Sequence, residues 1–270
     1  MQDDAPDLKL VNPDPPIPKL TDEAEKAIAA LARRQKRANG VLMKAINFVG
    51  GQVEDTLAIL PQGARAQIDQ AVRDALKKSY GLASKSRTGP MSYVSTSDGM
   101  HKALATISGA LGGLGGLPTA LAELPVATTM IFRAVQSVAE QYGEDPNAAE
   151  TRIQCLAVFG AGGEGPEDDG VDTAFIGARL GLTGAAVNSL IGKVAPKFGA
   201  ILSQKLASQA VPVLGAAAGA GTNYAFTDYY VEMAHVHFGL RRLARKYGEE
   251  PVLDAFHTAL VVGNIPVKRA

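Results

Sequence analysis

Apolar residues recur at helical spacing along most of the chain. Within residues 21–81 they fall on one side of successive segments, and residues 62–80 form a clear amphipathic helix that closes at Gly81. The same spacing continues through residues 100–264, in segments divided by glycine and proline. No stretch has the strict apolar and polar alternation that is typical of a strand. The pattern predicts an all-α, multi-helix bundle without a significant sheet.

Capping and breaking residues predict where these helices begin and end. Thr21 and Asp22 are suited to cap the first helix, and Asn39-Gly40 predicts a break between two helices. Gly143 predicts a stop, and Asp145–Asn147 predicts a cap that opens the next helix. The last helix is expected to end at glycine 263. Between these, helical spacing occupies three segments: 171–194, 196–210 and 211–248.

The predicted helices divide into a core and an N-terminal addition. Residues 1–20 hold many of the chain's 15 prolines, and proline at that density blocks helix formation and favours an extended arm. Residues 21–81 are expected to form helices that pack on the core. Residues 82–99 are expected to form a loop, and residues 100–264 the core itself.

The core contains two segments that resemble each other. These are FRAVQSVAEQYGEDP (132–146) and GLRRLARKYGEEP (239–251), and each is followed by an alanine-bearing helix. The resemblance predicts an internal duplication of long Gly/Ala-rich helices, with halves at about residues 100–160 and 206–263. Convergence on a common glycine-proline turn remains the alternative.

Each half also contains a run without charged residues, at 103–122 and at 206–227. About 20 uncharged residues would suffice to cross a bilayer, but the first run holds several glycines and a proline, which make it weakly apolar. Small residues let helices approach closely. We therefore expect the two runs to pack on each other as a helix pair.

Charge and cysteine content narrow the possible partners and compartment. Lys+Arg and Asp+Glu balance at 27 each, so the excess of basic residues that usually marks a nucleic-acid-binding protein is missing, and no nucleic-acid partner is expected. The single cysteine, Cys155, cannot form an internal disulfide, which favours a reducing compartment and therefore the cytoplasm. The acidic, proline-rich N-terminus does not have the pattern of a secretory signal.

A cluster of basic residues lies near the predicted end of the first helix. Its interpretation as a solvated helix end is favoured, because cations near a helix C-terminus suit the helix dipole. A patch for anionic lipid or an acidic partner is the alternative. The cluster consists of Arg33, Arg34, Lys36 and Arg37.

Two long stretches carry a resemblance to a known family. They are GGLPTALAELPVATTMIFRAVQSVAEQYGEDP with RIQCLAVFGAGG, and VPVLGAAAGAGTNYAFTDYYVEMAHVHFGLRRLARKYG. Over about residues 40–262 the chain resembles the EcsC family of bacterial proteins, whose name comes from a gene beside an ABC transporter. The resemblance implies a helical, partly hydrophobic protein of the cytoplasm or inner membrane face, and it implies no reaction. The positions that coincide with the family's pattern are Glu123, Leu124, Pro125, Arg133, Cys155, Phe159, Arg179, Asn223, Phe226, Asp228, His237, Phe238 and Arg241.

Polar residues that flank the uncharged runs form the first candidate site. Charges beside apolar helices are costly to bury unpaired, so they are expected to meet one another or to reach water. Ion pairs that fix the register of the helices are one interpretation, and a polar ligand pocket between the two halves is the other. The candidates are Glu123, Arg133, Asn223, Asp228, His237 and Arg241, with Arg179 added from the resemblance.

A weaker candidate is a metal site on the second long helix. Asp228, Glu232 and His235 project from one helix face, and Glu-x-x-His is the spacing used by di-iron carboxylate bundles. Those bundles need two such motifs and this chain has one, so an ion-paired face is the favoured interpretation. The acidic residues Glu164, Glu167, Asp168 and Asp169 lack the spacing of a calcium loop.

Other motifs of enzymes find no support in the sequence. The glycines around Gly112 lack the Gly-Lys-Ser/Thr ending of a phosphate-binding loop, and Cys155 has no convincing histidine partner. No catalytic residue and no cofactor is therefore expected.

The sequence leaves three classes of function open. The favoured one is a non-catalytic helical protein of the cytoplasm, peripheral at the inner membrane, that binds lipid or a membrane-protein partner. The second is a soluble interaction module without membrane contact. The third is a metal- or acid/base-dependent hydrolase that uses the region of Asp228, Glu232, His235 and His237.

Overall fold

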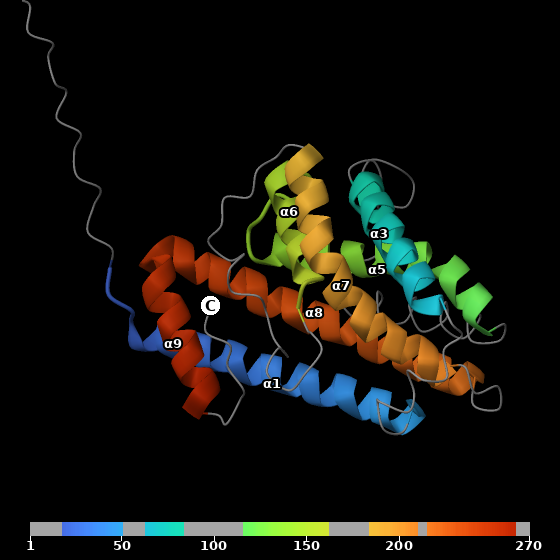
Figure 1. Ribbon diagram of the computed structural model, residues 1–270. Helices are drawn as coiled ribbons and strands as arrows, with labels where there is room; N and C mark the ends of the chain where they lie inside the picture. Colours follow the sequence, from blue (N-terminus) through green and yellow to red (C-terminus); the bar gives the residue numbers. More distant parts are fainter. Residues whose placement is uncertain (1–17, 51–62, 84–115, 162–183, 210–214, 263–270) are drawn as a thin grey trace, which may run out of the picture.

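The computed structural model describes residues 18–50, 63–83, 116–161, 184–209 and 215–262. Within these ranges the chain forms seven α-helices and no β-strand, which confirms the all-α prediction (Figure 1). The helices are α1 (Asp22–Gly50), α3 (Ala64–Ala83), α5 (Gly116–Gln141), α6 (Ala149–Val158), α7 (Gly184–Gln209), α8 (Gly215–Tyr247) and α9 (Glu249–Val262).

Several predictions fall outside these ranges. They concern most of the proline-rich arm and of the loop predicted at 82–99, the glycine cluster before residue 116, the acidic segment 164–169, and the candidate Arg179. The division into an arm, N-terminal helices and a core stays a prediction, as does the internal duplication.

The longest helix, α8, lies at the centre of the assembly and packs against α1, α5, α6, α7 and α9. Helix α1 crosses it in the antiparallel direction (Figure 1). Near the start of α1, the Thr21 hydroxyl lies 3.2 Å from the Tyr247 hydroxyl at the end of α8. Further along, the Arg34 guanidinium is paired with the Glu232 carboxylate.

Helix α5 runs beside α8 in the parallel direction (Figure 1). Tyr142, which follows the last residue of α5, has its hydroxyl 3.3 Å from Nδ1 of His235. Glu144 follows two residues later and is paired with Arg241, further toward the end of α8. These contacts set the register between the two helices.

The buried apolar residues form two groups that meet at α8. The larger joins α3, α5, α6, α7 and α8, and it includes Ala38 from α1. At its centre the Phe159 ring lies 5.1 Å from the rings of both Phe198 and Tyr230 and 6.0 Å from that of Phe132, measured between centroids. The smaller group packs α1 and α9 against the second half of α8. Cys155 on α6 is buried in the larger group, as expected for a residue on an inner helix face.

The break predicted at Asn39-Gly40 is wrong, because α1 continues through both residues to Gly50. Helix α3 likewise continues through Gly81 to Ala83. One glycine costs a helix about 1 kcal/mol relative to alanine, and packing along a neighbouring helix outweighs that cost. In α1 that neighbour is α8.

Proline 196 does not divide two helices, because it lies inside the continuous helix α7. The stop predicted at Gly143 is confirmed: its φ of 82° lies in the left-handed region that glycine adopts without strain. The predicted cap at Asp145–Asn147 is wrong in detail. Asp145 Oδ1 accepts a hydrogen bond from the Asn147 amide in a turn, and the residue at the N-cap of α6 is Ala148, without a side-chain cap.

No helix in the described ranges is both long enough and apolar enough to span a membrane. The uncharged run at 206–227 extends over the end of α7 and the beginning of α8. Of the run at 103–122, the described part is the beginning of α5.

Candidate functional site

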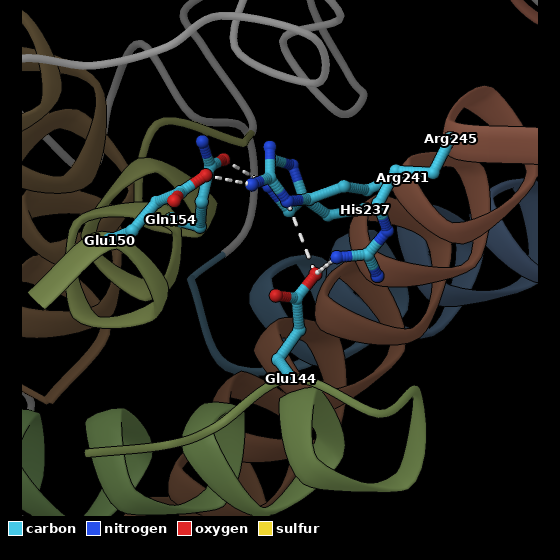
Figure 2. A network of polar contacts seen from close by, with 6 residues as sticks. All are labelled: Glu144, Glu150, Gln154, His237, Arg241 and Arg245. Carbon is cyan, nitrogen blue, oxygen red and sulfur yellow. Dashed lines mark hydrogen bonds and ion pairs between the residues drawn. The ribbon is translucent and has the colours of Figure 1, made fainter. Parts of the chain in front are cut away.

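The second half of α8 presents two buried polar side chains on one face. His237 and Arg241 are four residues apart and therefore lie one above the other on the helix. Only 1% of His237 and 8% of Arg241 is exposed. Both face the connection between α5 and α6 and the beginning of α6 (Figure 2). There they meet polar residues that complete a network: Glu144, Glu150, Gln154 and, from α8, Arg245.

Arg241 joins two carboxylates that come from either end of the α5–α6 connection. Its Nε donates a hydrogen bond to Glu144 Oε1 at 3.2 Å, and its terminal nitrogen donates one to Glu150. Arg245 also donates to Glu144 Oε1, at 2.8 Å. The two guanidinium groups and two carboxylates balance in charge, which is how a chain lowers the cost of burying ions.

The four ionic groups differ in their exposure to solvent. The side chains of Arg241 and Glu144 are 10% and 9% exposed, whereas those of Arg245 and Glu150 are 48% and 52% exposed. The Arg241–Glu144 pair is therefore the interior of the network. Arg245 and Glu150 lie at its edge, where solvent weakens each interaction.

His237 is held in one neutral form. Its Nε2 lies 2.8 Å from Gln154 Oε1, and because an amide oxygen only accepts, Nε2 carries the hydrogen and donates it. Burial, and to a lesser extent the nearby positive charge of Arg241, together lower the pKa of His237 from 6.5 to about 3. A general base near neutral pH needs a pKa close to that pH. The geometry therefore favours a structural role for this histidine.

The connection between α5 and α6 is itself fixed by local contacts. Gly143 turns the chain, and the Gln136 side chain, which is buried on α5, donates a hydrogen bond to the Pro146 carbonyl at 3.0 Å. This bond ties the turn back to the helix that precedes it. Glu144 and Glu150 are thereby placed on either side of Arg241.

The structure gathers only part of the polar cluster predicted from sequence. His237 and Arg241 come together, but Asp228 precedes His237 by two and a half turns of α8, a distance of about 13 Å along the axis. Arg133 is half-buried on α5. Glu123 and Asn223 lie within α5 and α8, in the parts whose side chains are not described. A ligand pocket between the halves stays a prediction.

The three weak metal candidates make separate contacts. The Arg34 Nε donates to Glu232 Oε2 and its terminal nitrogen donates to Glu232 Oε1 at 3.2 Å, so this carboxylate is engaged on both oxygens. His235 packs edge-on against Tyr142, with the ring centroids 5.7 Å apart. Asp228 is half-buried on the same helix. Among the residues that the structure describes, no three His, Cys, Asp or Glu side chains gather closely enough to hold a metal ion.

Four residues of the network are not singled out by the sequence alone: Glu144, Glu150, Gln154 and Arg245. One signal pointed to part of the site: His237, Arg241 and Arg245 recur at every fourth residue and so share a face of α8. The turn sequence around Glu144 had drawn attention only as a possible repeat. Nothing in the sequence gives the register between α8 and the α5–α6 connection.

The comparison with protein families gives one match. The EcsC protein family matches residues 22–243, which extend from the first residue of α1 into the last part of α8 and include His237 and Arg241. No curated protein and no solved structure was found to match. Because the family match covers more than half of the sequence, the chain belongs to the EcsC protein family.

Proposed function

We propose that this chain is a non-catalytic helical protein of the cytoplasm that is peripheral at the inner membrane and binds lipid or a membrane-protein partner. The observation that carries the proposal is that the two uncharged segments both contain the beginning of a long helix, and that these two beginnings lie at the same end of the assembly. Helix α5 begins in one of them and α8 begins in the other. The described parts of these segments within the two helices, residues 116–122 and 215–227, contain no charged residue.

The parallel register places both helix beginnings at the same end of the assembly. Tyr142 is level with His235, and Glu144 is level with Arg241. Since each helix rises 1.5 Å per residue, Gly116 and Gly215 lie within about 10 Å of each other along the shared direction. Helix α1, which is antiparallel to α8, ends there as well (Figure 1).

At this end of the assembly two helices begin with small, uncharged residues. Such an end is suited to approach an apolar partner. No helix in the described ranges could span a membrane, and the proposal concerns contact with a membrane surface. The ion-paired network around Arg241 lies toward the other end of α8. Its polar residues pair with one another, so a structural role explains their burial and no reaction needs to be assigned to them.

Vesicle flotation tests this proposal. Purified protein is mixed with phosphatidylcholine vesicles, with and without phosphatidylglycerol, and centrifuged through a density gradient. We expect the protein to float with at least one type of vesicle, and protein from bacterial lysate to be recovered partly with the membrane fraction. Protein that stays at the bottom with both vesicles, and wholly in the supernatant of the lysate, would instead indicate an interaction module without membrane contact.

We also propose that the two halves of the core arose by duplication. Both long helices end at a Tyr-Gly pair whose glycine has a left-handed φ, 82° at Gly143 and 85° at Gly248, and each is followed by a shorter helix. This shared turn supports the proposal. An alignment of EcsC sequences would test it: halves that align with each other in distant members support duplication, and a likeness limited to the turn supports convergence.

A further inference from the structure

The outer face of α1 has a regular charge pattern. Lys26, Arg33 and Arg37 are exposed, and their spacing of seven and four residues places them in one line along the helix. The opposite face, with Ile28 and Leu31, is buried against α8 and α9. We call the three aligned cations the basic stripe. It extends over about 16 Å of helix.

No acidic residue interrupts α1 after Glu25. The acidic residues Asp22, Glu23 and Glu25 all lie in the first turn, and the bases follow. Charge along α1 therefore changes from acidic to basic in the direction of the end where α5 and α8 begin. The basic stripe leads toward the end of the assembly where α5 and α8 begin (Figure 1).

Contacts on the inner side fix the rotation of α1 about its own axis. Arg34 directly follows Arg33 of the basic stripe in the sequence, but its side chain lies on the side of α1 that faces α8. There it pairs with the Glu232 carboxylate, which neutralises its charge. Leu31 packs on Gly239, where a β-carbon would lie only 2.9 Å from both methyl groups of the leucine. Because these contacts hold the inner side, the basic stripe is presented outward on a straight, ordered element.

We propose that the basic stripe binds the phosphate groups of anionic phospholipids at the membrane surface. The inference rests on the proposed membrane function and names both its lipid class and the surface that makes contact. A straight row of cations complements a flat, negatively charged surface, and each Lys or Arg near such a surface strengthens binding. Over the whole chain Lys+Arg and Asp+Glu balance at 27 each, so the chain lacks the overall basic excess that would favour nucleic acid as the partner of the basic stripe.

The choice of phospholipid over an acidic protein follows from what adjoins the basic stripe. A phospholipid surface presents phosphate charge above an apolar layer. The chain presents the basic stripe along α1 and, at the end to which it leads, the uncharged starts of α5 and α8. The phosphate charge and the apolar layer of a phospholipid surface therefore have counterparts in the basic stripe and, further along the direction of α1, in the two uncharged helix starts.

The test compares three proteins for binding to vesicles of phosphatidylcholine and phosphatidylglycerol. One is the unmodified chain, and one carries Lys26→Gln, Arg33→Gln and Arg37→Gln. The matched control carries Lys77→Gln, Lys78→Gln and Lys193→Gln, which remove three cations that are also exposed, from α3 and α7. Both variants lose the same net charge, and circular dichroism with thermal unfolding establishes that both retain the fold.

We expect the basic-stripe variant to bind anionic vesicles about a hundredfold more weakly than the unmodified chain. The control variant should bind within about threefold of it, and added salt should weaken vesicle binding by the unmodified chain and by the control variant more steeply than binding by the basic-stripe variant. That combination supports the proposal.

Three outcomes would overturn it. If the unmodified chain floats with anionic vesicles and the basic-stripe variant floats equally, membrane binding stands but another surface makes the contact. Equal losses in both variants would show that net charge, and not the stripe, is responsible. If the chain ignores all vesicles but binds a single-stranded RNA oligonucleotide or a poly-glutamate peptide through the same three residues, the partner is not lipid and the proposed membrane function fails with it.

Discussion

Arg241 lies between Glu144 and Glu150, and its removal tests whether the network stabilises the fold. The Arg241→Ala variant would leave Glu144, whose side chain is 9% exposed, with the half-exposed Arg245 as its ion-pair partner in the network. The variant loses the charge-assisted hydrogen bonds that Arg241 makes in the interior of the network, which should cost about 2 to 3 kcal/mol. Urea unfolding of the purified variant measures this loss in the free energy of unfolding.

Arg245→Ala is the matched control, because it removes the same kind of charge from the edge of the network. Its side chain is 48% exposed, so the pair it forms with Glu144 is screened by water. We expect a loss of less than about 1 kcal/mol. Equal losses in the two arginine variants would contradict the distinction between an interior pair and an edge pair.

His237 makes a prediction about pH. Its pKa is lowered from 6.5 to about 3 in the folded chain, so below pH 6.5 the unfolded chain binds a proton that the folded chain does not. The stabilisation that comes from keeping His237 neutral is fully present above about pH 6.5. As the pH falls toward about 3, the free energy of unfolding decreases by about 1.4 kcal/mol per pH unit. Urea unfolding at several pH values measures this dependence.

The His237→Gln variant separates this effect from the titration of carboxylates. Both proteins share the carboxylates, so only the difference between their pH profiles belongs to the histidine. Between about pH 6.5 and about pH 5 we expect the unmodified chain to lose about 2 kcal/mol more than the variant. Parallel profiles would show that folding does not lower the pKa of His237.

At the scale of elements, two glycines are expected to respond in opposite directions to alanine. Gly40 lies in the middle of α1 with open space around its α-carbon, so Gly40→Ala should stabilise the chain by up to about 1 kcal/mol. Gly143 also has open space but holds a φ of 82°, so Gly143→Ala should destabilise by about 1 to 2 kcal/mol. Thermal unfolding measures both changes in stability. If Gly40→Ala were destabilised, the result would support a helix break at Gly40 and contradict a continuous α1.

Hydrophobic spacing was enough to predict the helical class, because the period of an amphipathic helix is visible in one sequence. It failed at Asn39-Gly40 and at proline 196, where local residues favour a break and the helix nevertheless continues. The outcome there depends on the packing of the helix against its neighbours. Such packing joins residues far apart in the sequence.

The residues of the candidate site also differ in how far the sequence predicts them. His237 and Arg241 could be selected because they share a helix face next to an apolar stretch. Glu144, Glu150 and Gln154 could not, since their role depends on how far the α5–α6 connection extends along α8. One sequence specifies the faces of its helices more clearly than the register between them.

For the whole molecule, the Arg34–Glu232 pair predicts a measurable coupling between α1 and α8. The pair has two hydrogen bonds and is partly buried, with side-chain exposures of 30% and 17%. A double-mutant cycle with Arg34→Gln and Glu232→Gln should give a coupling energy of about 1 kcal/mol. The same cycle with Arg37→Gln in place of Arg34→Gln should give none, because Arg37 belongs to the outer face; equal couplings would contradict the observed rotation of α1.

The antiparallel crossing of α1 and α8 also bears on how the chain is made. The contact between Thr21 and Tyr247 joins residues 226 positions apart, and the one between Arg34 and Glu232 joins residues 198 positions apart. At about 5 to 20 residues per second, a ribosome needs on the order of 10 to 40 seconds to synthesise the intervening chain. Throughout that time the apolar side of α1 has emerged without the helix that buries it. Nascent chains arrested before α8 should therefore depend on chaperones that recognise exposed apolar helices, and that dependence should end once α8 has left the ribosome.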